Sequence, residues 1–386
     1  MIKILILASM INVGDVSHAN SVANELAKKV NGLPQTITID ANKDYKEIAR
    51  EYSNFLKELK GPKENYIMLV VGEKALQTFD NLSEKIDTNA YVYCGIHQYN
   101  ALLSKKLSID HVGIPETELD TASKKAIIES FAHYTLTFAV PNNNPSAETL
   151  KAAYEDWHID NKPKIGDNII VMLPGDAPDE HNKMKYFSKE SAEKIAREVT
   201  NLWKQVGKHY KVLIENGPRT GKFDPKTGEV ACSHEYKKGE DPRSAVDDVS
   251  KHFVKSLEIP ENKFQFFNFA FENDAETRNK ISFHEQLLYL VQASDSNYFV
   301  VPGESISTIA QITLMLKGDQ VIGVRPDSMN QSHTAIFNSA INKGFISYFD
   351  DNEFLIQPSH PSMRIEDDSV IVAGQVYEGY IEKFYE

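Results

Sequence analysis

An acid and three hydroxyls stand together after an apolar run in segment 300–311, whose sequence is VVPGESISTIAQ. Glu304 can accept hydrogen bonds from the hydroxyls of a ribose or another sugar. Ser305, Ser307 and Thr308 can donate to a phosphate at the start of a helix, where the helix dipole also favours negative charge. The same residues also suit a plain helix cap with an acid on the surface, so the segment alone leaves both interpretations open.

A second chemistry for this segment is nucleophilic, because it falls one residue short of the G-x-S-x-G motif of serine hydrolases. Ser305 would then be the nucleophile, and an acid and a histidine should follow it along the chain. That order is supplied by Asp327 or Asp350 and then His333 or His360. A nucleophile elbow is strained and needs small flanking residues, which Ile306 is not. We therefore favour a ligand-binding turn in which backbone N–H groups from Gly303 onward meet the ligand.

Three other apolar runs end in residues that suit the same ligand. After the first run, Gly14 opens a turn toward a helix that we expect to begin near Ser17 and His18. His18 is a candidate general base or phosphate ligand, although a single histidine is more often a polar cap. Two later runs end in Gly175-Asp176 and in Arg219-Thr220. The guanidinium of the arginine matches phosphate geometry in a bidentate way, although an arginine in a surface loop is also common.

Strand-like and helix-like segments alternate along both halves of the chain. The first run, 2–8, is short and fully apolar, as in a central parallel strand. Alternation of this kind indicates βαβ crossovers and parallel sheets. The expected strands are 2–8, 36–39, 66–71, 90–94, 111–114, 168–173, 210–214, 264–269, 298–301 and 320–324. The expected helices are 17–31, 43–59, 73–80, 147–157, 188–206, 245–257, 284–294, 307–317 and 335–343.

The chain of 386 residues is long enough for two domains, at roughly 100–200 residues per domain. A cluster of proline and asparagine at 141–145 separates two α/β halves. We expect two Rossmann-like doubly wound domains facing across a cleft, because ligands of such folds bind outside the carboxyl ends of the strands. The expected divisions are an N-terminal domain at 1–145, a connecting helix and linker at 146–164, a C-terminal domain at 165–350 and a C-terminal segment at 351–386.

Composition narrows the class of protein. Hydrophobic residues make up 41% and charged residues 25%, as in ordinary soluble domains, and the formal net charge is -13. An acidic balance argues against nucleic-acid binding, which needs a basic face. No apolar stretch approaches the ~20 residues that span a bilayer. We interpret the N-terminus as a first strand rather than a signal peptide, because Asp15 interrupts the apolar segment.

Several cofactor classes lack support in the sequence. The twelve histidines form no H-E-x-x-H pattern, and the acidic pairs Asp350-Asp351 and Asp367-Asp368 fall in turn-like segments, so we expect no metal site. No G-x-G-x-x-G follows the first strand, which argues against a dinucleotide cofactor. The two cysteines, Cys94 and Cys232, form no disulfide framework. We therefore expect a cytoplasmic protein with no bound cofactor.

Three segments of the second half resemble the mitochondrial-fission ELM1-like family, which is related to GT-B glycosyltransferases. They are NIIVMLPGDAP at 168–178, YKVLIENGPRTGKFD at 210–224 and HEQLLYLVQASDSNYFVVPGESISTIAQITLMLKGDQVIGV at 284–324. In the first half, GDVSHANSVANELAKKV at 14–30 and VVGEKA at 70–75 are similar to the family's first loop and helix and to a strand-end glycine. The chain departs from the family where Glu304-Ser305 replaces Asp-Ser and where 217–221 replaces a paired arginine before Thr-Pro.

The resemblance implies a GT-B fold and, together with the strand ends, a glycosyltransferase whose substrate is a nucleotide-diphosphate sugar. The diphosphate would lie near Ser305, Ser307 and Arg219, with Glu304 on the ribose or the sugar. An acceptor that the sequence does not identify would enter near Gly14–His18, with His18 as the base. Helix dipoles and positive charge would stabilise the leaving diphosphate, so the transfer would need no metal ion.

Two alternatives stay open beside the glycosyltransferase. The first is a non-catalytic GT-B-like protein that binds a partner through 221–243, a polar segment that looks like an insertion. The second is the serine hydrolase with Ser305 as its nucleophile.

Overall fold

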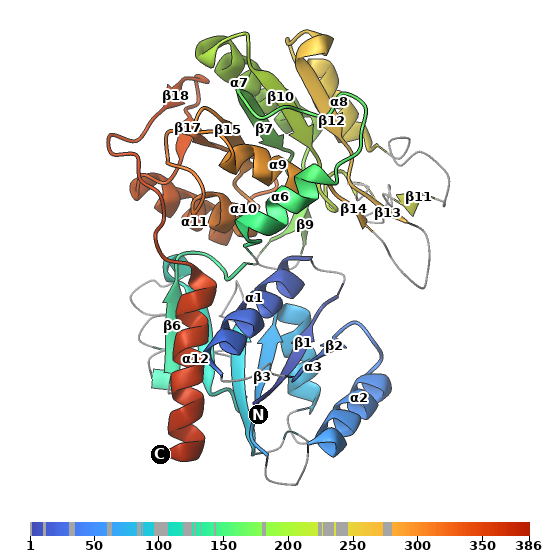
Figure 1. Cartoon of the computed structure of the whole chain (residues 1–386), viewed down its shortest axis with the longest axis vertical. Helices are drawn as coiled ribbons and strands as arrows, with labels where there is room; N and C mark the ends of the chain where they lie inside the picture. Colours follow the sequence, from blue (N-terminus) through green and yellow to red (C-terminus); the bar gives the residue numbers. More distant parts are fainter. Residues whose placement is uncertain are drawn as a thin grey trace. The chain divides into compact units, whose positions relative to one another are not determined.

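The computed structural model describes residues 2–10, 13–30, 35–59, 64–82, 86, 88–95, 107–118, 126, 129–131, 133–142, 144–179, 183–222, 226, 235–236, 246–272 and 280–386. The chain divides into two compact units. The first unit comprises Met1–Asn144 and Ile365–Glu386, and the second comprises Pro145–Arg364. Figure 1 shows that helices and a sheet make up each unit. Among the described helices, none has the length and apolar character that crossing a bilayer requires.

The first unit is built on six parallel strands in the order β2-β1-β3-β4-β5-β6. β1, β3 and β4 are buried along their whole length, which explains their nearly unbroken apolar sequences. The chain order places the topological switch point between β1 and β3, as in flavodoxin-like sheets. The strands are β1 (Lys3–Ala8), β2 (Gln35–Asp40), β3 (Tyr66–Val71), β4 (Ala90–Gly95), β5 (His111–Pro115) and β6 (His133–Thr137).

Helices cover both faces of this sheet. α2 (Tyr45–Glu58) and α3 (Glu73–Leu82) pack on one face through a core that includes Tyr52, Phe55 and Phe79. α1 (Val13–Lys29) and α12 (Asp368–Tyr385) pack on the other face through a core that includes Val22 and Val376. Figure 1 shows α12 running beside β6. The last helix of the chain thus completes the layer that α1 begins.

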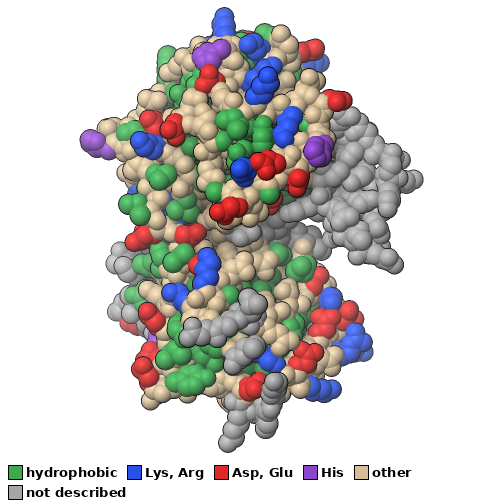
Figure 2. Space-filling model, in the orientation of Figure 1, with side chains coloured by type: hydrophobic (Ala, Val, Ile, Leu, Met, Phe, Trp, Pro, Cys, Tyr) green, Lys and Arg blue, Asp and Glu red, His purple; other side chains and the backbone are tan. Residues whose placement is uncertain are grey.

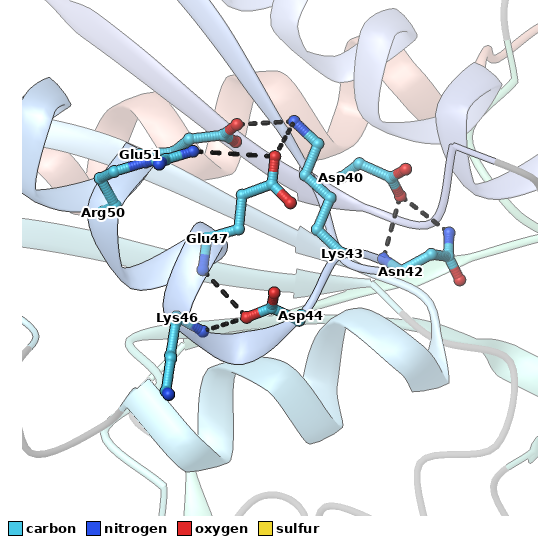
Figure 3. Close-up of polar contacts among 8 residues, drawn as sticks. All are labelled: Asp40, Asn42, Lys43, Asp44, Lys46, Glu47, Arg50 and Glu51. Carbon is cyan, nitrogen blue, oxygen red and sulfur yellow. Dashed lines mark hydrogen bonds and ion pairs between the residues drawn. The ribbon is translucent and has the colours of Figure 1, made fainter. Parts of the chain in front are cut away.

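The turn from β2 into α2 is fixed by polar contacts (Figure 3). The Asp44 carboxylate accepts hydrogen bonds from the backbone N–H groups of Lys46 and Glu47, at 2.7 and 3.2 Å. This N-cap satisfies two of the unpaired donors at the helix start. The Lys43 ammonium lies 2.6 Å from a Glu51 carboxylate oxygen, one helical turn beyond Glu47. The cap places the helix start at Tyr45, two residues later than the sequence predicts.

The second unit contains seven strands in the order β12-β10-β7-β15-β16-β17-β18, and the edge strand β18 pairs antiparallel. Numbered along the chain, the six parallel strands lie in the order 3-2-1-4-5-6, which is the order of a Rossmann sheet. The two sheet orders confirm the prediction of two Rossmann-like doubly wound α/β domains. The strands are β7 (Asn168–Met172), β10 (Lys211–Glu215), β12 (Phe264–Phe267), β15 (Tyr298–Pro302), β16 (Val321–Val324), β17 (Ser347–Phe349) and β18 (Leu355–Ile356).

Two helices pack on one face of the second sheet, α7 (Lys189–Val206) and α8 (Asp248–Ser256), through a core that includes Trp203 and Phe253. Ser188 is the N-cap of α7, as the sequence predicts, and its hydroxyl accepts from the Ser191 N–H at 3.1 Å. The remaining helices are α6 (Ala147–Glu155), α9 (His284–Gln292), α10 (Ile306–Ile312) and α11 (Gln331–Asn342). Two small sheets pair β8 (Ala177–Pro178) with β9 (Met184–Lys185), and β13 (Ala270–Glu272) with β11 (Glu235–Tyr236) and β14 (Lys280–Ile281).

Two elements of the first unit go beyond the sequence prediction, namely β6 and α12. β6 mixes polar and apolar residues because it is an edge strand, and Leu136 stays exposed. α12 packs on the first unit, so the expected C-terminal segment 351–386 is divided between the two units at 364/365. The carboxylate of Asp368 fixes this helix, accepting from the N–H groups of Phe138 and Ala139 at 2.9 and 3.2 Å. The expected linker 146–164 is part of the second unit and contains α6.

Charged side chains of both signs are interspersed over the displayed face of each unit (Figure 2). Acidic and basic groups alternate over short distances there, and hydrophobic side chains lie between them. The excess of negative charge in the sequence is therefore not gathered into a single acidic patch on that face.

Candidate functional site

The switch point of the second unit lies between β7 and β15. These strands are neighbours, but the chain continues from β7 to β10 on one side and from β15 to β16 on the other. The residues that follow the two strands therefore border the crevice where doubly wound sheets bind ligands. A direct hydrogen bond joins them, from the Gly175 N–H to the Glu304 carboxyl oxygen Oε1 at 2.6 Å. The structure thus brings together two of the strand ends that the sequence singles out.

Glu304 is a buried carboxyl, with 3% of the residue exposed. Its second oxygen, Oε2, is buried and has no hydrogen-bond partner in the described part of the chain. Burial raises the pKa of Glu304 to about 7, against the hydrogen bond from Gly175 and the charge of Arg219, which lower it. The carboxyl therefore keeps its proton to a higher pH than an ordinary glutamate does. The expectation of a surface acid does not hold for this residue.

The turn after β10 packs against the turn after β7. The Asp176 N–H donates to the Arg219 carbonyl oxygen at 3.1 Å, and a Cβ added to Gly175 would lie 3.0 Å from the Arg219 Cβ. The Arg219 residue is exposed, whereas Thr220 is buried and its hydroxyl accepts from the Gly217 N–H at 3.0 Å. A cation is thereby placed beside the Glu304 carboxyl.

The Asp176 side chain is buried and hydrogen-bonded within the protein. Its Oδ1 accepts from the Phe187 N–H at 2.9 Å, and the residue is 1% exposed. The aspartate therefore braces the loop after β7 against the segment that leads into α7.

The hydroxyls after β15 contact one another. Ser305 Oγ lies 2.8 Å from Thr308 Oγ1, which donates to the Met172 sulfur at 3.3 Å. The N–H groups of Gly303 and Ser305 already donate to the carbonyl oxygens of Val324 and Pro302, at 2.9 and 3.1 Å. The helix that follows, α10, has only seven residues. Two of the backbone N–H groups that the sequence offers to a ligand are thus already paired within the protein.

Two remaining residues of this turn complete its description. Ser307 lies in the first turn of α10 and is half-buried. Ser305 is the residue before the helix, but its side chain makes no capping hydrogen bond. The plain helix-cap interpretation of Ser305 is thus not what the structure shows.

The two histidines that the hydrolase interpretation offers lie in a helix start and in an exposed segment. His333 is the third residue of α11, where its Nδ1 accepts from the Asn330 N–H at 3.2 Å in a capping box. His360 is an exposed residue of the segment after β18. The described hydrogen bonds of Ser305 do not include either imidazole, and the Ser305 hydroxyl pairs with Thr308 instead.

The first unit carries its own strand-end cluster. α1 begins at Val13, so Gly14 lies inside the helix rather than in a turn before it. His18 is buried, and its Nε2 lies 3.0 Å from the Tyr93 hydroxyl. A Cβ added to Gly95 at the end of β4 would lie 2.4 Å from His18 Cε1, so that glycine makes room for the imidazole. Asp15 covers Gly72 after β3 in the same way, with 2.1 Å between its Oδ2 and an added Cβ.

Gly95→Ala is expected to destabilise the first unit by about 1–3 kcal/mol, because the added methyl overlaps the His18 ring. In a His18→Ala background the closest contacts are gone and only the Tyr93 hydroxyl, 2.9 Å from the added Cβ, still crowds it, so the same change should cost less. Urea unfolding of the wild type, both single variants and the double variant measures this coupling. Equal costs in both backgrounds would show that His18 does not occupy this position.

Sequence reasoning missed three polar residues at these strand ends. Tyr93 holds His18, and Glu215 at the end of β10 contacts His284 at the start of α9, with 2.7 Å between Oε1 and Nδ1. The available signal was the acid that closes the apolar run 210–214. Its partner lies 69 residues further along the chain. The expected insertion 221–243 lies largely outside the described residues.

The fold and the strand ends define a two-unit α/β protein with doubly wound sheets, and two solved structures with some likeness to it are glycosyltransferases. One is a glycosyltransferase from Rickettsia africae ESF-5, with a TM-score of 0.40 and 13% identity over 99% of this chain and 94% of that chain. The other is an O-GlcNAc transferase variant from Thermobaculum terrenum, with a TM-score of 0.36 and 9% identity over 99% of this chain and 63% of that one. No family model and no curated protein matches the sequence.

Proposed function

We propose that the protein is a GT-B-like glycosyltransferase whose second unit binds a nucleoside-diphosphate sugar at the β7–β15 switch point. The observation that carries the proposal is the Glu304 carboxyl, which lies at that point with one buried oxygen that has no partner among the described residues. A buried polar group without a partner costs about 1–3 kcal/mol. A carboxyl with a perturbed pKa in a crevice is typical of functional sites. A ligand hydroxyl would supply the missing hydrogen bond.

In the proposed donor site, a charged side chain binds the diphosphate, and the hydroxyl and carboxyl side chains bind the rest of the donor. Arg219 binds the diphosphate, because a guanidinium can donate two parallel hydrogen bonds to phosphate oxygens. Ser305, Ser307 and Thr308 add neutral donors beside it. Glu304 takes one hydroxyl of the ribose or the sugar through Oε2, since Oε1 already accepts from Gly175. Arg219 also stabilises the charge on the leaving diphosphate, so the transfer needs no metal ion.

The remaining residues of the site hold these groups in place. Gly175 allows the turn after β10 to approach, Asp176 braces the loop, and Thr220 closes the turn that carries the arginine. The Gly303 N–H donates to the Val324 carbonyl oxygen and so extends the pairing of β15 with β16 up to Glu304, which fixes the position of the Glu304 backbone. Supporting residues of this kind keep a binding site within reach of its ligand.

The acceptor side of the proposal concerns the first unit. Three parts of the proposal stay predictions: the role of His18 as general base, the entry of the acceptor near Gly14–His18 and the interdomain cleft. Membership of the ELM1-like family also stays a prediction. The buried contact between His18 and Tyr93 supports a positioned imidazole, which a general base requires. The partner-binding alternative also stays a prediction, because most of 221–243 lies outside the described residues.

Glu304→Gln tests the proposal. The amide keeps an oxygen for the Gly175 N–H but offers a ligand hydroxyl a donor in place of a carboxylate oxygen. We expect affinity for the sugar nucleotide that the wild type binds to fall by about 10-fold or more. The measurement is isothermal titration with a panel of UDP and GDP sugars at pH 7.5. A wild-type protein that binds none of them would refute the proposal.

Glu198→Gln is the matched control. Glu198 lies on α7 and is, among the residues that the structure describes, the second buried carboxyl whose pKa burial raises to about 7, and its Oε2 also lacks a described partner. In the folded chain both carboxyls have a pKa above the ordinary value of 4.5 that they have when the chain is unfolded, so the folded state binds their protons more tightly. Each should therefore lower the stability of the wild type as pH rises from about 4.5 to 7, by at most about 3 kcal/mol. Both glutamine variants should remove this loss of stability, but only Glu304→Gln should lower the affinity for the sugar nucleotide.

A further inference from the structure

His284, the first residue of α9, is hydrogen-bonded through both ring nitrogens. Nδ1 lies 2.7 Å from Glu215 Oε1, and Nε2 lies 3.1 Å from the Gln311 side-chain oxygen Oε1. Both partners are oxygens that accept, so both nitrogens must carry a proton for the two bonds to form together. The contacts therefore select the doubly protonated, positively charged imidazolium.

The surroundings of His284 oppose and support this charge. Burial disfavours the imidazolium, and the positive end of the α9 dipole meets it at the first helical residue. The charges of Glu215 on β10 and Glu285 on α9, with the hydrogen bonds that the ring donates to Glu215 and to the Gln311 oxygen on α10, outweigh burial and raise the pKa of His284 above its ordinary value of 6.5. Glu215 contributes most to that rise, because its side chain is only 6% exposed and lies in direct contact.

The pair belongs to the same edge of the sheet as the proposed donor site. Glu215 ends β10 and stands in register with Met172, which ends β7. The Met172 sulfur accepts from Thr308, and Thr308 lies one turn before Gln311 on α10. Three hydrogen bonds, the register of β7 with β10 and one turn of α10 thus link these four residues and His284 into a ring of neighbours at the carboxyl ends of these strands. Thr308 in turn contacts the Ser305 hydroxyl.

The ring also borders the turn that carries the arginine. A Cβ added to Gly217 would lie 4.0 Å from the Met172 methyl carbon and 3.9 Å from the Thr220 hydroxyl. The turn 217–220 therefore lies next to Met172 at the end of β7 and follows Glu215 at the end of β10. The His284 side chain is 26% exposed, so its charge is partly open to this edge.

We propose that His284, oriented by Glu215, is a second cationic residue of the donor site and stabilises the diphosphate as it leaves the sugar. This inference rests on the proposed function. The bond between the anomeric carbon and the diphosphate oxygen breaks, and its electron pair stays on the diphosphate. The acceptor oxygen forms the new bond to the anomeric carbon and gives its proton to a base. His284 keeps both of its protons, and what it supplies is positive charge in a partly desolvated edge. Glu215 is the positioning residue.

The test is the pH dependence of sugar-nucleotide affinity between pH 5.5 and 8.5. UDP-glucose and GDP-mannose are suitable probes, because their diphosphate is esterified at both ends and keeps its charge over this range. The measurements use the Glu304→Gln background, so that the Glu304 carboxyl does not titrate. Affinity should fall by about 10-fold as pH rises through the pKa of His284. Adding His284→Gln should abolish this slope and leave the weaker, high-pH affinity at every pH.

Glu285→Gln is the matched control, because Glu285 is an exposed neighbour on the same helical turn. Its charge is the smallest of the contributions that raise the pKa of His284, so this variant should move the slope to lower pH by much less than Glu215→Gln does. Glu215→Gln is the second variant, and it should move the slope to lower pH while its thermal midpoint shows that the protein is folded. A merely structural role for His284 and Glu215 would change stability without changing the slope.

The outcomes separate this inference from the proposed function. If the wild type binds a probe and His284→Gln binds it equally at every pH, the inference is wrong and the proposed function stands. If the wild type binds none of the UDP and GDP sugars of the panel, the proposed function fails and the inference falls with it. The ring proton of His284 gives an additional readout without ligand. Its NMR titration should have a midpoint above 6.5 in the wild type and a lower one in Glu215→Gln, and an unchanged midpoint would contradict the orienting role of Glu215.

Discussion

Arg219→Ala is expected to weaken the binding of UDP or GDP by about 10- to 100-fold, the range that a hydrogen-bonded charge contributes. Arg219 is exposed and its backbone carbonyl, not its side chain, makes the described contact with Asp176. The thermal midpoint should therefore stay within about a degree or two of the wild type, because exposed substitutions change stability little. Isothermal titration with each nucleoside diphosphate, together with calorimetry, measures both effects.

Two further variants make this result specific. Arg219→Lys keeps the charge but not the paired donors of the guanidinium, so it should recover only part of the affinity. Arg197→Ala removes an arginine from α7 that pairs with Glu353 at 2.9 Å, and it should leave nucleotide affinity unchanged. If Arg219→Ala binds the diphosphates as tightly as the wild type, the diphosphate does not contact the turn after β10.

Asn216→Asp is expected to destabilise the second unit by about 3–5 kcal/mol, because it buries a new charge without a partner. The Asn216 amide nitrogen lies within hydrogen-bonding distance of three side chains, with Asp247 Oδ2 at 3.1 Å, Asn268 Oδ1 at 2.9 Å and the Ser250 hydroxyl at 3.3 Å. Its oxygen accepts from the Phe269 N–H at 2.7 Å. An aspartate would bring a second carboxylate against Asp247 at the ends of β10 and β12. Calorimetric unfolding at pH 7 should show a lowered midpoint for the second unit.

Asn262→Asp is the control for Asn216→Asp. Asn262 is exposed before β12, so the same change in charge should alter stability by no more than about 0.5 kcal/mol. A small effect at both positions would contradict the buried network around Asn216.

Much of the fold could be predicted because its strands carry their signal locally. β1, β3 and β4 are buried on both faces, so their sequences are nearly continuous apolar runs between turns. β6 lacks that signal because it is an edge strand with an exposed Leu136. α12 could not be assigned to the first unit, because its packing there depends on contacts more than 300 residues apart along the chain, as between Tyr380 and the Asn65 carbonyl before β3.

The candidate site could be predicted only as a set of strand ends. The position of Glu304 after an apolar run predicts an acid at the edge of a sheet. Its contact with Gly175, 129 residues away, depends on strand order, which a single sequence does not encode locally. The sequence also does not show that the Gly303 N–H donates to Val324 at the end of β16 and that the Ser305 N–H is used within the turn. The same reason hid the pairing of Glu215 with His284.

The most direct test of the account is a crystal structure of the protein with the sugar nucleotide that it binds most tightly. We predict that the diphosphate lies within hydrogen-bonding distance of the Arg219 guanidinium and that a hydroxyl of the ribose or the sugar donates to Glu304 Oε2. A nucleotide bound at the β1–β3 switch point of the first unit, or anywhere that leaves Glu304 Oε2 without a partner, would contradict the central claim.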